Sequence, residues 1–340
     1  MSFSLGDLTT PILGAPMAGG SGTPALAAAV SDTGGLGFLP AGYLCAQRFA
    51  ETIAATRSLG SGPIGVNLFV PQPCIASDAE IERYRRLVEP LARRYGVEPG
   101  RPHPDDDGWA AKLDVISDLR PEAVSFTFGC PEAAVLTRLR SRGVLTMVTV
   151  SSRAEAAQAV GAGADALVVQ GPEAGGHRSI FDPAAEPPTE PLGTLLAQTV
   201  GLGVPVVAAG GAGDAAAVRR ILDGGAVAAQ VGTALLLCDE AGTSTAHRGA
   251  LRDPQFAETV VTRAFSGRYA RGLANDFTAR LSAAAPPAYP QVNHITGPVR
   301  AAAAAAADPQ GVSLWAGTAW RGTAGGSAAD VVAALTAQLW

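Results

Sequence analysis

The chain has 340 residues and a formal net charge of −5 at pH 7. A chain of this length can bury a large core, either as one large α/β domain or as two modest ones. Arginines and acidic side chains are intermixed along it, with no basic stripe that would follow a phosphate backbone. We therefore expect no nucleic-acid partner.

The cysteines and the N-terminal segment are typical of a reducing compartment. The four cysteines lie far apart, without the C-x-x-C spacing of zinc sites and redox pairs, so we expect reduced, structural thiols. The segment "MSFSLGDLTTPIL" lacks the basic start and the uninterrupted apolar core of a signal peptide, and no apolar run approaches the length of a bilayer span. These features predict a cytoplasmic protein without a membrane partner.

Short apolar runs recur along the chain, and each ends in Gly, Pro, Asn or Gln before an alanine-rich helical stretch begins. Such runs are typical of buried parallel strands. The predicted strands are 11–16, 35–42, 63–69, 123–129, 145–151, 166–171, 205–211 and 226–235. Helices are predicted between most of them, at 24–33, 44–59, 131–142, 153–161, 191–201 and 214–223. This repeated alternation favours a (β/α)8 TIM barrel over an open doubly wound sheet.

Two regions interrupt this alternation. Residues 70–118 contain a charged helix and a turn-rich Pro/Asp segment, which we interpret as an insertion between strands three and four. Residues 236–325 contain helical pieces and an alanine run, which predict a smaller accessory helical subdomain over the barrel mouth. The predicted organisation is a barrel over 1–235, an accessory or substrate subdomain over 236–325, and a C-terminal helix over 326–340 that returns to the barrel.

Glycine-rich loops follow the last two predicted strands. The active site of a TIM barrel lies at the C-terminal ends of its strands, and these two loops commonly hold a phosphate. The loop "AAGGAGD" brings Gly210, Gly211 and Gly213 to the start of a helix, where backbone amides can approach an anion. The loop "QVGTALL" contains Gly232 and Thr233, whose amide and hydroxyl groups can donate hydrogen bonds. A bound phosphate group is predicted here.

The remaining strand ends favour a flavin among the ligands that carry a phosphate. The first strand ends with Ala15, Pro16 and Met17, which can lie against a flat ring. Asn67 and Gln170 end the third and sixth strands, and their amide groups can donate and accept hydrogen bonds along the edge of a heterocycle. No lysine ends a strand, so neither a Schiff base to pyridoxal phosphate nor a Schiff-base aldolase is expected.

Taken together, these segments resemble the motifs of a known family. In chain order they are "PILGAPMAGG", "GGLGFLPAGY", "GVNLF", "VVQGPEAGGHR", "AAGGAGD", "QVGTALL", "SGRYARGLANDF" and "SLWAGT". The ordered series is similar to that of the nitronate monooxygenases, also called 2-nitropropane dioxygenases, and it covers nearly the whole chain. The resemblance implies non-covalently bound FMN, with His177 as the catalytic histidine. It implies cofactor contacts at Asn67, Gln170, Gly175, Gly211, Gln230, Val231, Gly232 and Thr233.

The resemblance also implies a reaction: oxidation of alkyl nitronates, such as propionate 3-nitronate, by O2 to a carbonyl product and nitrite, through a one-electron step between nitronate and FMN. His177 follows the predicted sixth strand in "QGPEAGGHR", where Gly175 and Gly176 let the backbone lie against the cofactor. An imidazole can bind the anion as a cation or abstract a proton from a neutral nitroalkane as a base, because its unperturbed pKa lies near neutrality. Both roles stay open at this point.

Aromatic residues provide candidate walls for the substrate pocket, namely Phe126, Phe128 and Tyr289. The two phenylalanines alternate on the predicted fourth strand, so one face of the barrel would receive both, and ordinary core packing explains them equally well. Structural roles are favoured for the nearby charged residues Glu173, Arg268 and Arg271. No metal site is predicted from the other histidines, which are His103, His247 and His294.

Two other functions remain as alternatives. An NAD(P)H-dependent FMN reductase of the enoyl-thioester or quinone type shares the barrel and a similar E-A-G-G-H loop, although Gln170 ahead of that loop favours the monooxygenase. A flavin-binding or biosynthetic accessory protein without turnover of its own is the third possibility. For the leading hypothesis, the expected small-molecule partners are a nitronate or nitroalkane and O2, and the expected assembly is a monomer or a homodimer.

Overall fold

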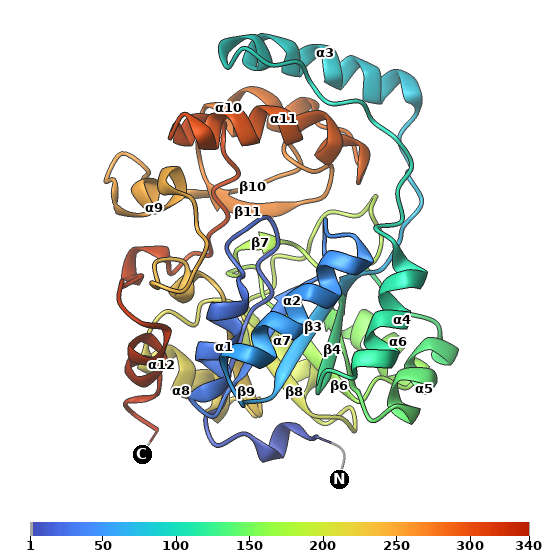
Figure 1. Cartoon of the computed structure of the whole chain (residues 1–340), viewed down its shortest axis with the longest axis vertical. Coiled ribbons are helices and arrows are strands. Elements are labelled where there is room, and N and C mark those ends of the chain that lie inside the picture. Colours follow the sequence, from blue (N-terminus) through green and yellow to red (C-terminus); the bar gives the residue numbers. More distant parts are fainter. Residues whose placement is uncertain (1–2, 340) are drawn as a thin grey trace.

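A closed barrel of eight parallel strands forms the centre of the computed structural model, which describes residues 3–339 (Figure 1). In barrel order the strands are β1 (Ile12–Gly14), β2 (Leu36–Pro40), β3 (Ile64–Phe69), β4 (Ala123–Thr127), β5 (Leu145–Val150), β6 (Ala166–Gln170), β8 (Val206–Ala209) and β9 (Ala228–Val231). Every neighbouring pair is parallel, including β1 with β9, which closes the barrel. The predicted (β/α)8 fold is confirmed.

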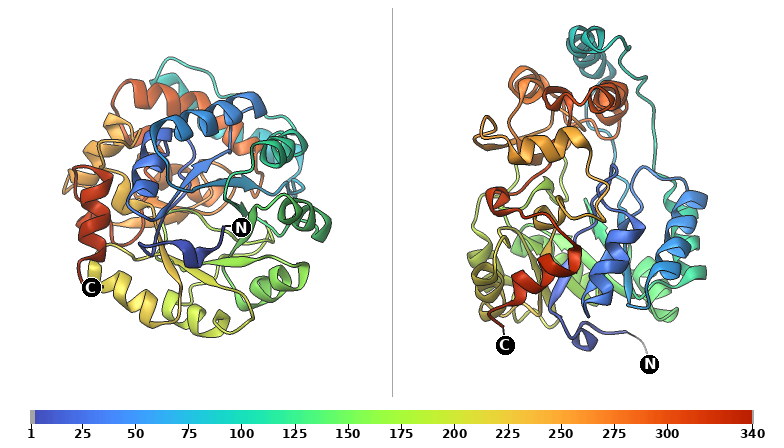
Figure 2. Two further views of the ribbon diagram at one scale, coloured as in Figure 1. Left: turned by 60° about the horizontal axis from the view of Figure 1, so that its bottom comes forward. Right: turned by 60° about the vertical axis from the view of Figure 1, so that its left-hand side comes forward.

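Helices surround the barrel: α1 (Pro24–Asp32), α2 (Ala46–Leu59), α4 (Trp109–Leu119), α5 (Ala133–Ser141), α6 (Arg153–Ala162), α7 (Leu192–Thr199), α8 (Ala215–Asp223) and α12 (Ala328–Thr336). Local capping begins several of them, as where the Thr23 hydroxyl accepts a hydrogen bond from the Leu26 amide at 3.0 Å, just before Pro24. Helix α12 lies against α8 and α1 (Figure 2). Within residues 3–339, no helix is both long and apolar enough to cross a membrane.

The last barrel strand is shorter than the predicted run 226–235. It ends at Val231, and the following residues form the 3-10 helix η2 (Thr233–Leu235). The chain turns at Gly232, whose carbonyl accepts a hydrogen bond from the Leu235 amide at 2.9 Å. This early turn places Gly232 and Thr233 at the barrel mouth, beyond the strand.

A lid covers the C-terminal ends of the barrel strands (Figures 1 and 2). It comprises the helices α3 (Asp78–Arg94), α9 (Thr245–Arg252), α10 (Asp276–Leu281) and α11 (Gln291–Ala305), and the strands β7 (Gly176–His177), β10 (Thr259–Thr262) and β11 (Ala270–Leu273). The three strands form an antiparallel sheet in the order β10-β11-β7. The prediction of a helical subdomain omitted this sheet, because its strands are short and one of them comes from the barrel loop after β6.

The predicted insertion at 70–118 contributes to both the lid and the helix layer. Its first helix, α3, packs against α11 of the lid. The two helices share a buried apolar cluster, in which Tyr84 and Val88 of α3 join Val292 and Ile295 of α11. Its second helix, α4, packs against α2 beside the barrel instead. The lid is therefore held by apolar packing between segments that lie far apart in the sequence.

Candidate active site

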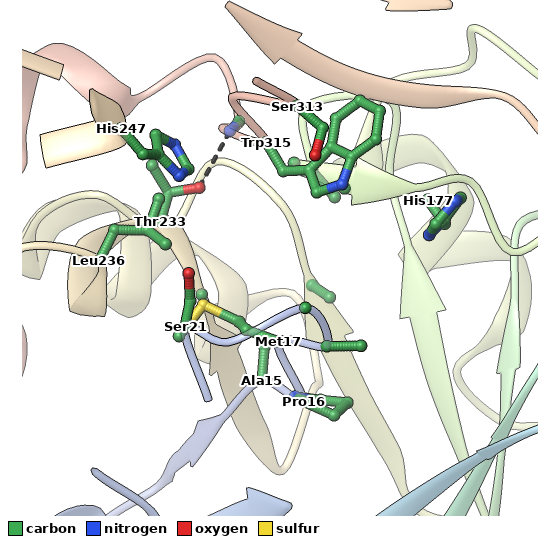
Figure 3. A pocket seen from close by; sticks show the side chains of 18 of the residues that line it. Ala15, Pro16, Met17, Ser21, His177, Thr233, Leu236, His247, Ser313 and Trp315 are labelled. Atoms are coloured by element: carbon green, nitrogen blue, oxygen red, sulfur yellow. Dashed lines mark hydrogen bonds between the residues drawn. The ribbon is translucent and has the colours of Figure 1, made fainter. Parts of the chain in front are cut away.

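A cavity of about 460 Å³ lies between the barrel strand ends and the lid. Figure 3 shows its interior, with His177 and Trp315 to one side and Thr233 and His247 to the other. His177 lines this cavity, as does every residue that the sequence analysis assigned to the cofactor. These are Ala15, Pro16, Met17, Asn67, Gln170, Gly175, Gly176, Gly210, Gly211, Gly213, Gln230, Val231, Gly232 and Thr233.

The loops after β8 and β9 form one end of the cavity. Gly210 and Gly211 have φ values of +126° and +68°, a backbone conformation that favours glycine. Within residues 3–339, the amides of Gly211 and Ala212 donate to no backbone acceptor. The Thr233 hydroxyl accepts a hydrogen bond from the Gly317 amide at 2.9 Å, which leaves its own hydrogen available. Free amides and a hydroxyl close to the start of α8 suit an oxyanion such as a phosphate.

Three other glycines of the site serve different physical needs. A Cβ on Gly175 would lie 2.4 Å from the Gly317 nitrogen, and one on Gly213 would lie 2.6 Å from the Ala319 Cβ. These two glycines are therefore required by close packing against the segment that follows the lid. Gly176 has φ +75°, and a Cβ there would meet open space. Glycine is favoured at this position by the backbone conformation, and the open space beside it leaves room for a ligand.

The amide side chains at the strand ends differ in how far they are already hydrogen-bonded. Gln170 donates to the His177 carbonyl at 2.9 Å and accepts from the Ser179 amide at 3.0 Å, so it shapes its own loop. Asn67 donates to the neighbouring strand β4. The Oε1 atom of Gln230 is buried and has no hydrogen-bond partner within the described residues. A ligand with an N–H or O–H group would satisfy this atom.

His177 is held rigidly between the lid sheet and a group of aromatic rings. Strand β7 pairs it with Ala270 of β11, and its Nε2 lies 2.8 Å from the Ser266 hydroxyl oxygen. The rings around it are those of Phe69, Phe128, Tyr289 and Trp315. Burial, together with the charges of Arg268 and Arg300, lowers the pKa of His177 to about 3. The imidazole is therefore neutral at pH 7.

Positive charge near His177 comes from arginine side chains. Arg268 is buried, lies 4.2 Å from the centre of the Phe128 ring, and donates to the Ile180 carbonyl at 2.7 Å. Arg300 belongs to α11 and lines the cavity directly. No salt bridge within residues 3–339 involves either guanidinium. Two cations, one of them in the cavity wall, therefore lie on the His177 side, which favours an anionic ligand there.

A family model described as nitronate monooxygenase matches residues 4–338 of the chain. The chain belongs to the nitronate monooxygenase family. The resemblance inferred from its ordered motifs is therefore confirmed. Enzymes of this family are flavin-dependent oxidoreductases that act on nitronates, which agrees with the free backbone amides of the glycine-rich loops and with the arginines beside His177.

Similar proteins cover almost the full length of this nitronate monooxygenase family member. The chain is 39% identical to the nitronate monooxygenase of Paraburkholderia phytofirmans, over 97% of this chain and 92% of that protein. It is 40% identical to that of Pseudomonas aeruginosa, over 90% of each. The solved structure of nitroalkane oxidase from Streptomyces ansochromogenes superposes with a TM-score of 0.94 at 44% identity, covering 98% of this chain and 97% of that one. FabK from Thermotoga maritima, at 24% identity and a TM-score of 0.75, shares the fold.

Phe126, a predicted pocket wall, does not line the cavity. It is fully buried between the barrel and the helix layer, where its ring centre lies 5.8 Å from that of Trp109. The two phenylalanines do not share a face, because β4 ends before Phe128, whose φ is +78°. Phe128 and Tyr289 lie close to His177, at 5.3 and 6.3 Å between ring centres. Neither lines the cavity, and together they form a layer behind the imidazole.

The sequence analysis missed several cavity residues, most of them in the lid. They are Tyr43, Phe69, His247, Phe265, Asn293, Arg300 and Trp315. His247 was assigned no role, yet its buried Nε2 has no hydrogen-bond partner among residues 3–339, and burial lowers its pKa to about 4. No local motif marks His247, Asn293 and Arg300, because they reach the cavity only through the packing of the lid helices. Phe69 is the last residue of β3, so its place at a strand end was the signal that could have identified it.

Two charged residues of the loop region hold the structure around the site. The Glu173 carboxylate accepts a hydrogen bond from the Leu192 amide at 3.3 Å. Arg271 donates to the Pro172 carbonyl at 2.8 Å and to the Thr259 hydroxyl at 2.9 Å. These contacts tie the loop after β6 to α7 and to the lid sheet, which agrees with the structural roles expected for both side chains.

His103 and His294 come together outside the cavity, although they lie far apart in the sequence. Their rings stack with 3.8 Å between centres and 5° between planes. The His294 Nε2 lies 3.5 Å from an oxygen of Asp105. One ligand atom from each of His103, Asp105 and His294 lies within 4.8 Å of the other two. The trio joins the segment before α4 to helix α11.

Proposed function

We propose that this cavity binds FMN non-covalently and that the enzyme oxidises alkyl nitronates, of the propionate 3-nitronate type, with O2 to a carbonyl product and nitrite. The observation that carries the proposal is the convergence of His177, Arg300 and all the predicted cofactor contacts on one cavity. Family membership gives the reaction class. The specific flavin and the site residues are inferred from the cavity.

The residues present fit FMN. The free amides of Gly211 and Ala212, with the Thr233 hydroxyl, would hold the phosphate at the start of α8. The unpaired Gln230 oxygen would accept a hydrogen bond from the flavin, and Met17 would lie against it. When bound, the flavin supplies the electron acceptor that the oxidation of an anion requires.

His177 would act as a neutral hydrogen-bonding group beside the substrate. Its pKa of about 3 argues against the cationic role that the sequence left open. A neutral imidazole can still accept the α-proton of a neutral nitroalkane, although burial beside arginines makes it a weak base. Aromatic rings surround the imidazole in this part of the cavity. A nitronate, which has already lost its proton, needs no base.

Purified protein loaded with FMN is expected to be yellow and to consume O2 when propionate 3-nitronate is added, without NAD(P)H. The oxygen-electrode rate and the carbonyl and nitrite yields are the measurements. Protein boiled in advance controls for oxidation of the free nitronate in solution. If FMN-loaded protein turns over no nitronate, the proposed reaction is wrong.

Family membership does not favour the alternative NAD(P)H-dependent reductase, and the same preparation tests it. Anaerobic bleaching of the flavin by NADH or NADPH would support a reductase, whereas an unchanged spectrum is expected. FMN binding with neither reaction would instead support a flavin-binding accessory protein. The cytoplasmic location and the monomeric or homodimeric assembly stay predictions.

A further inference from the structure

Arg300 occupies a position in the cavity that the flavin-binding residues do not explain. It lies on α11, on the same helix face as Asn293 and Gly297, which also line the cavity. Gly297 leaves this face open, because a Cβ there would have no neighbour within 4 Å. Among the described residues that line the cavity, Arg300 is the only arginine or lysine.

The guanidinium of Arg300 is fixed by its own helix. Its Nε donates to the Thr296 hydroxyl at 3.1 Å, and its Nη2 donates to the Asn293 side-chain oxygen at 2.7 Å. Within residues 3–339, Nη1 has no hydrogen-bond acceptor. The guanidinium is therefore held in one orientation while the N–H groups of Nη1 stay available to a ligand.

The charge of Arg300 has no counterion in the protein. The ionisable side chains that act on it most are the phenols of Tyr43, Tyr84 and Tyr289, and burial raises the pKa of each, so all three are neutral at pH 7. Glu173 also lines the cavity, but its charge acts on Arg178 and Arg271 and not on Arg300. An arginine stays protonated at neutral pH even where burial lowers its pKa. A partly buried, oriented cation without a carboxylate partner is a site for an anion.

The other basic side chains near the cavity are less suitable for binding an anion. Arg268 lies behind Phe128 and does not line the cavity. His177 is neutral, as described above. We propose that Arg300 is the substrate-binding residue that receives the negatively charged oxygens of the substrate, so that the site selects anionic over neutral nitro compounds. This inference rests on the proposed function. It leaves His177 as a neutral hydrogen-bonding group beside the substrate.

Propionate is a suitable probe, because its planar carboxylate resembles a nitronate in shape and charge and it is not oxidised by the enzyme. Propionamide is its neutral counterpart. We expect propionate to inhibit the wild-type FMN enzyme competitively against ethyl nitronate and to perturb the flavin absorbance, with a dissociation constant at least tenfold below that of propionamide. Equal binding of the two by the wild-type enzyme would overturn the proposal without any variant.

Arg300→Gln is expected to raise the dissociation constant of propionate and the KM for ethyl nitronate by about ten- to one hundred-fold, the range of a charge-assisted hydrogen bond. The KM for neutral nitroethane is expected to change less than about twofold. Arg300→Lys, which keeps the charge but not the planar fork, should lie between the two enzymes. Arg280→Gln, on the exposed surface of α10, is the matched control and should behave as wild type.

Three results would count against the proposal. The first is unchanged propionate binding in both Arg300 variants, and the second is an equal loss of nitroethane and nitronate binding. The third is a loss of FMN affinity relative to riboflavin affinity while the selectivity for anionic ligands is unchanged. This third result would assign Arg300 to the cofactor phosphate. Failure of the proposed reaction is distinguishable. In that case the wild-type enzyme would turn over no nitronate, while its preference for propionate over propionamide would still be measurable from the flavin spectrum.

Discussion

At the scale of single residues, burial changes what the side chains of the site can do. An exposed histidine titrates near neutrality, and the position of His177 after two glycines is compatible with either an acid or a base. In the folded chain its imidazole is enclosed by aromatic rings and lies near Arg268 and Arg300, which lower its pKa to about 3. His177 is thus neutral at pH 7, and we assign the binding of the anion to Arg300.

The lowered pKa of His177 predicts a pH dependence of stability. The unfolded chain takes up a proton on this residue near its ordinary pKa of 6.5, whereas the folded chain does so only near 3. Stability should therefore be fully present above about pH 6.5 and decrease as the pH falls toward about 3. His177→Gln is expected to lose less stability between about pH 8 and pH 5 than the wild type.

Thermal unfolding midpoints at these two pH values measure the effect. The Gln255→Ala variant, at an exposed position without a titratable side chain, serves as the control and should follow the wild type. An identical pH dependence in His177→Gln and the wild type would contradict the assignment of a neutral, buried imidazole. Because His247 also has a lowered pKa, of about 4, the variant should retain part of the acid sensitivity.

At the scale of secondary-structure elements, the end of β4 determines which aromatic ring meets the site. Phe126 is within the strand and faces the helix layer, whereas Phe128 follows the strand and turns toward His177. Arg268 stacks over the Phe128 ring, and Phe69 lies 4.6 Å from it between ring centres. Two phenylalanines two positions apart therefore have different surroundings, one in the main core and the other in the layer behind His177.

Phe126→Ala should consequently affect stability alone, whereas Phe128→Ala should also affect activity. Phe126→Ala is expected to lower the free energy of unfolding by about 3–5 kcal/mol, because it leaves a cavity in the main core, while the KM of the folded enzyme stays unchanged. Phe128→Ala should alter nitronate turnover as well, because the ring contacts the imidazole and Arg268. Urea denaturation and steady-state kinetics separate the two effects. A changed KM in Phe126→Ala would contradict its placement outside the cavity.

At the scale of the whole molecule, the lid is assembled from distant segments. Helix α3 precedes β4 in the chain, yet it packs on α11, which follows the barrel. The Tyr84 hydroxyl of α3 donates to the carbonyl of Ala264 in the lid. The barrel itself supplies β7 to the lid sheet. The cavity is closed by these non-local contacts, so lid stability and flavin retention should be coupled.

Tyr84→Phe tests that coupling. Removal of the hydroxyl leaves the buried carbonyl of Ala264 without its side-chain donor, which should cost about 1–3 kcal/mol in the free energy of unfolding. The flavin should also dissociate faster, as measured by the recovery of free FMN fluorescence on dilution. Tyr269→Phe is the matched control, because its hydroxyl contributes no hydrogen bond within residues 3–339. A destabilised variant with unchanged flavin release would show that the lid does not retain the cofactor.

The amino-acid sequence by itself determined the barrel, the glycine-rich loops at its mouth and the family. These features are local: apolar runs of strand length alternate with capped helices, and glycines at strand ends permit backbone conformations such as φ +126° at Gly210. Equivalent strand ends meet at one edge of a parallel barrel, so His177 and the cofactor residues could be grouped before any contact was known.

Only the tertiary structure decided the rest of the site. Arg300, His247 and Trp315 reach the cavity because lid segments pack together across long sequence separations, which no local pattern records. The glycine requirement at Gly175 comes from contact with Gly317 rather than from a ligand. The protonation state of His177 depends on burial and on nearby charges, and both arise from packing. Sequence patterns specify elements, whereas the chemistry of side chains depends on their surroundings.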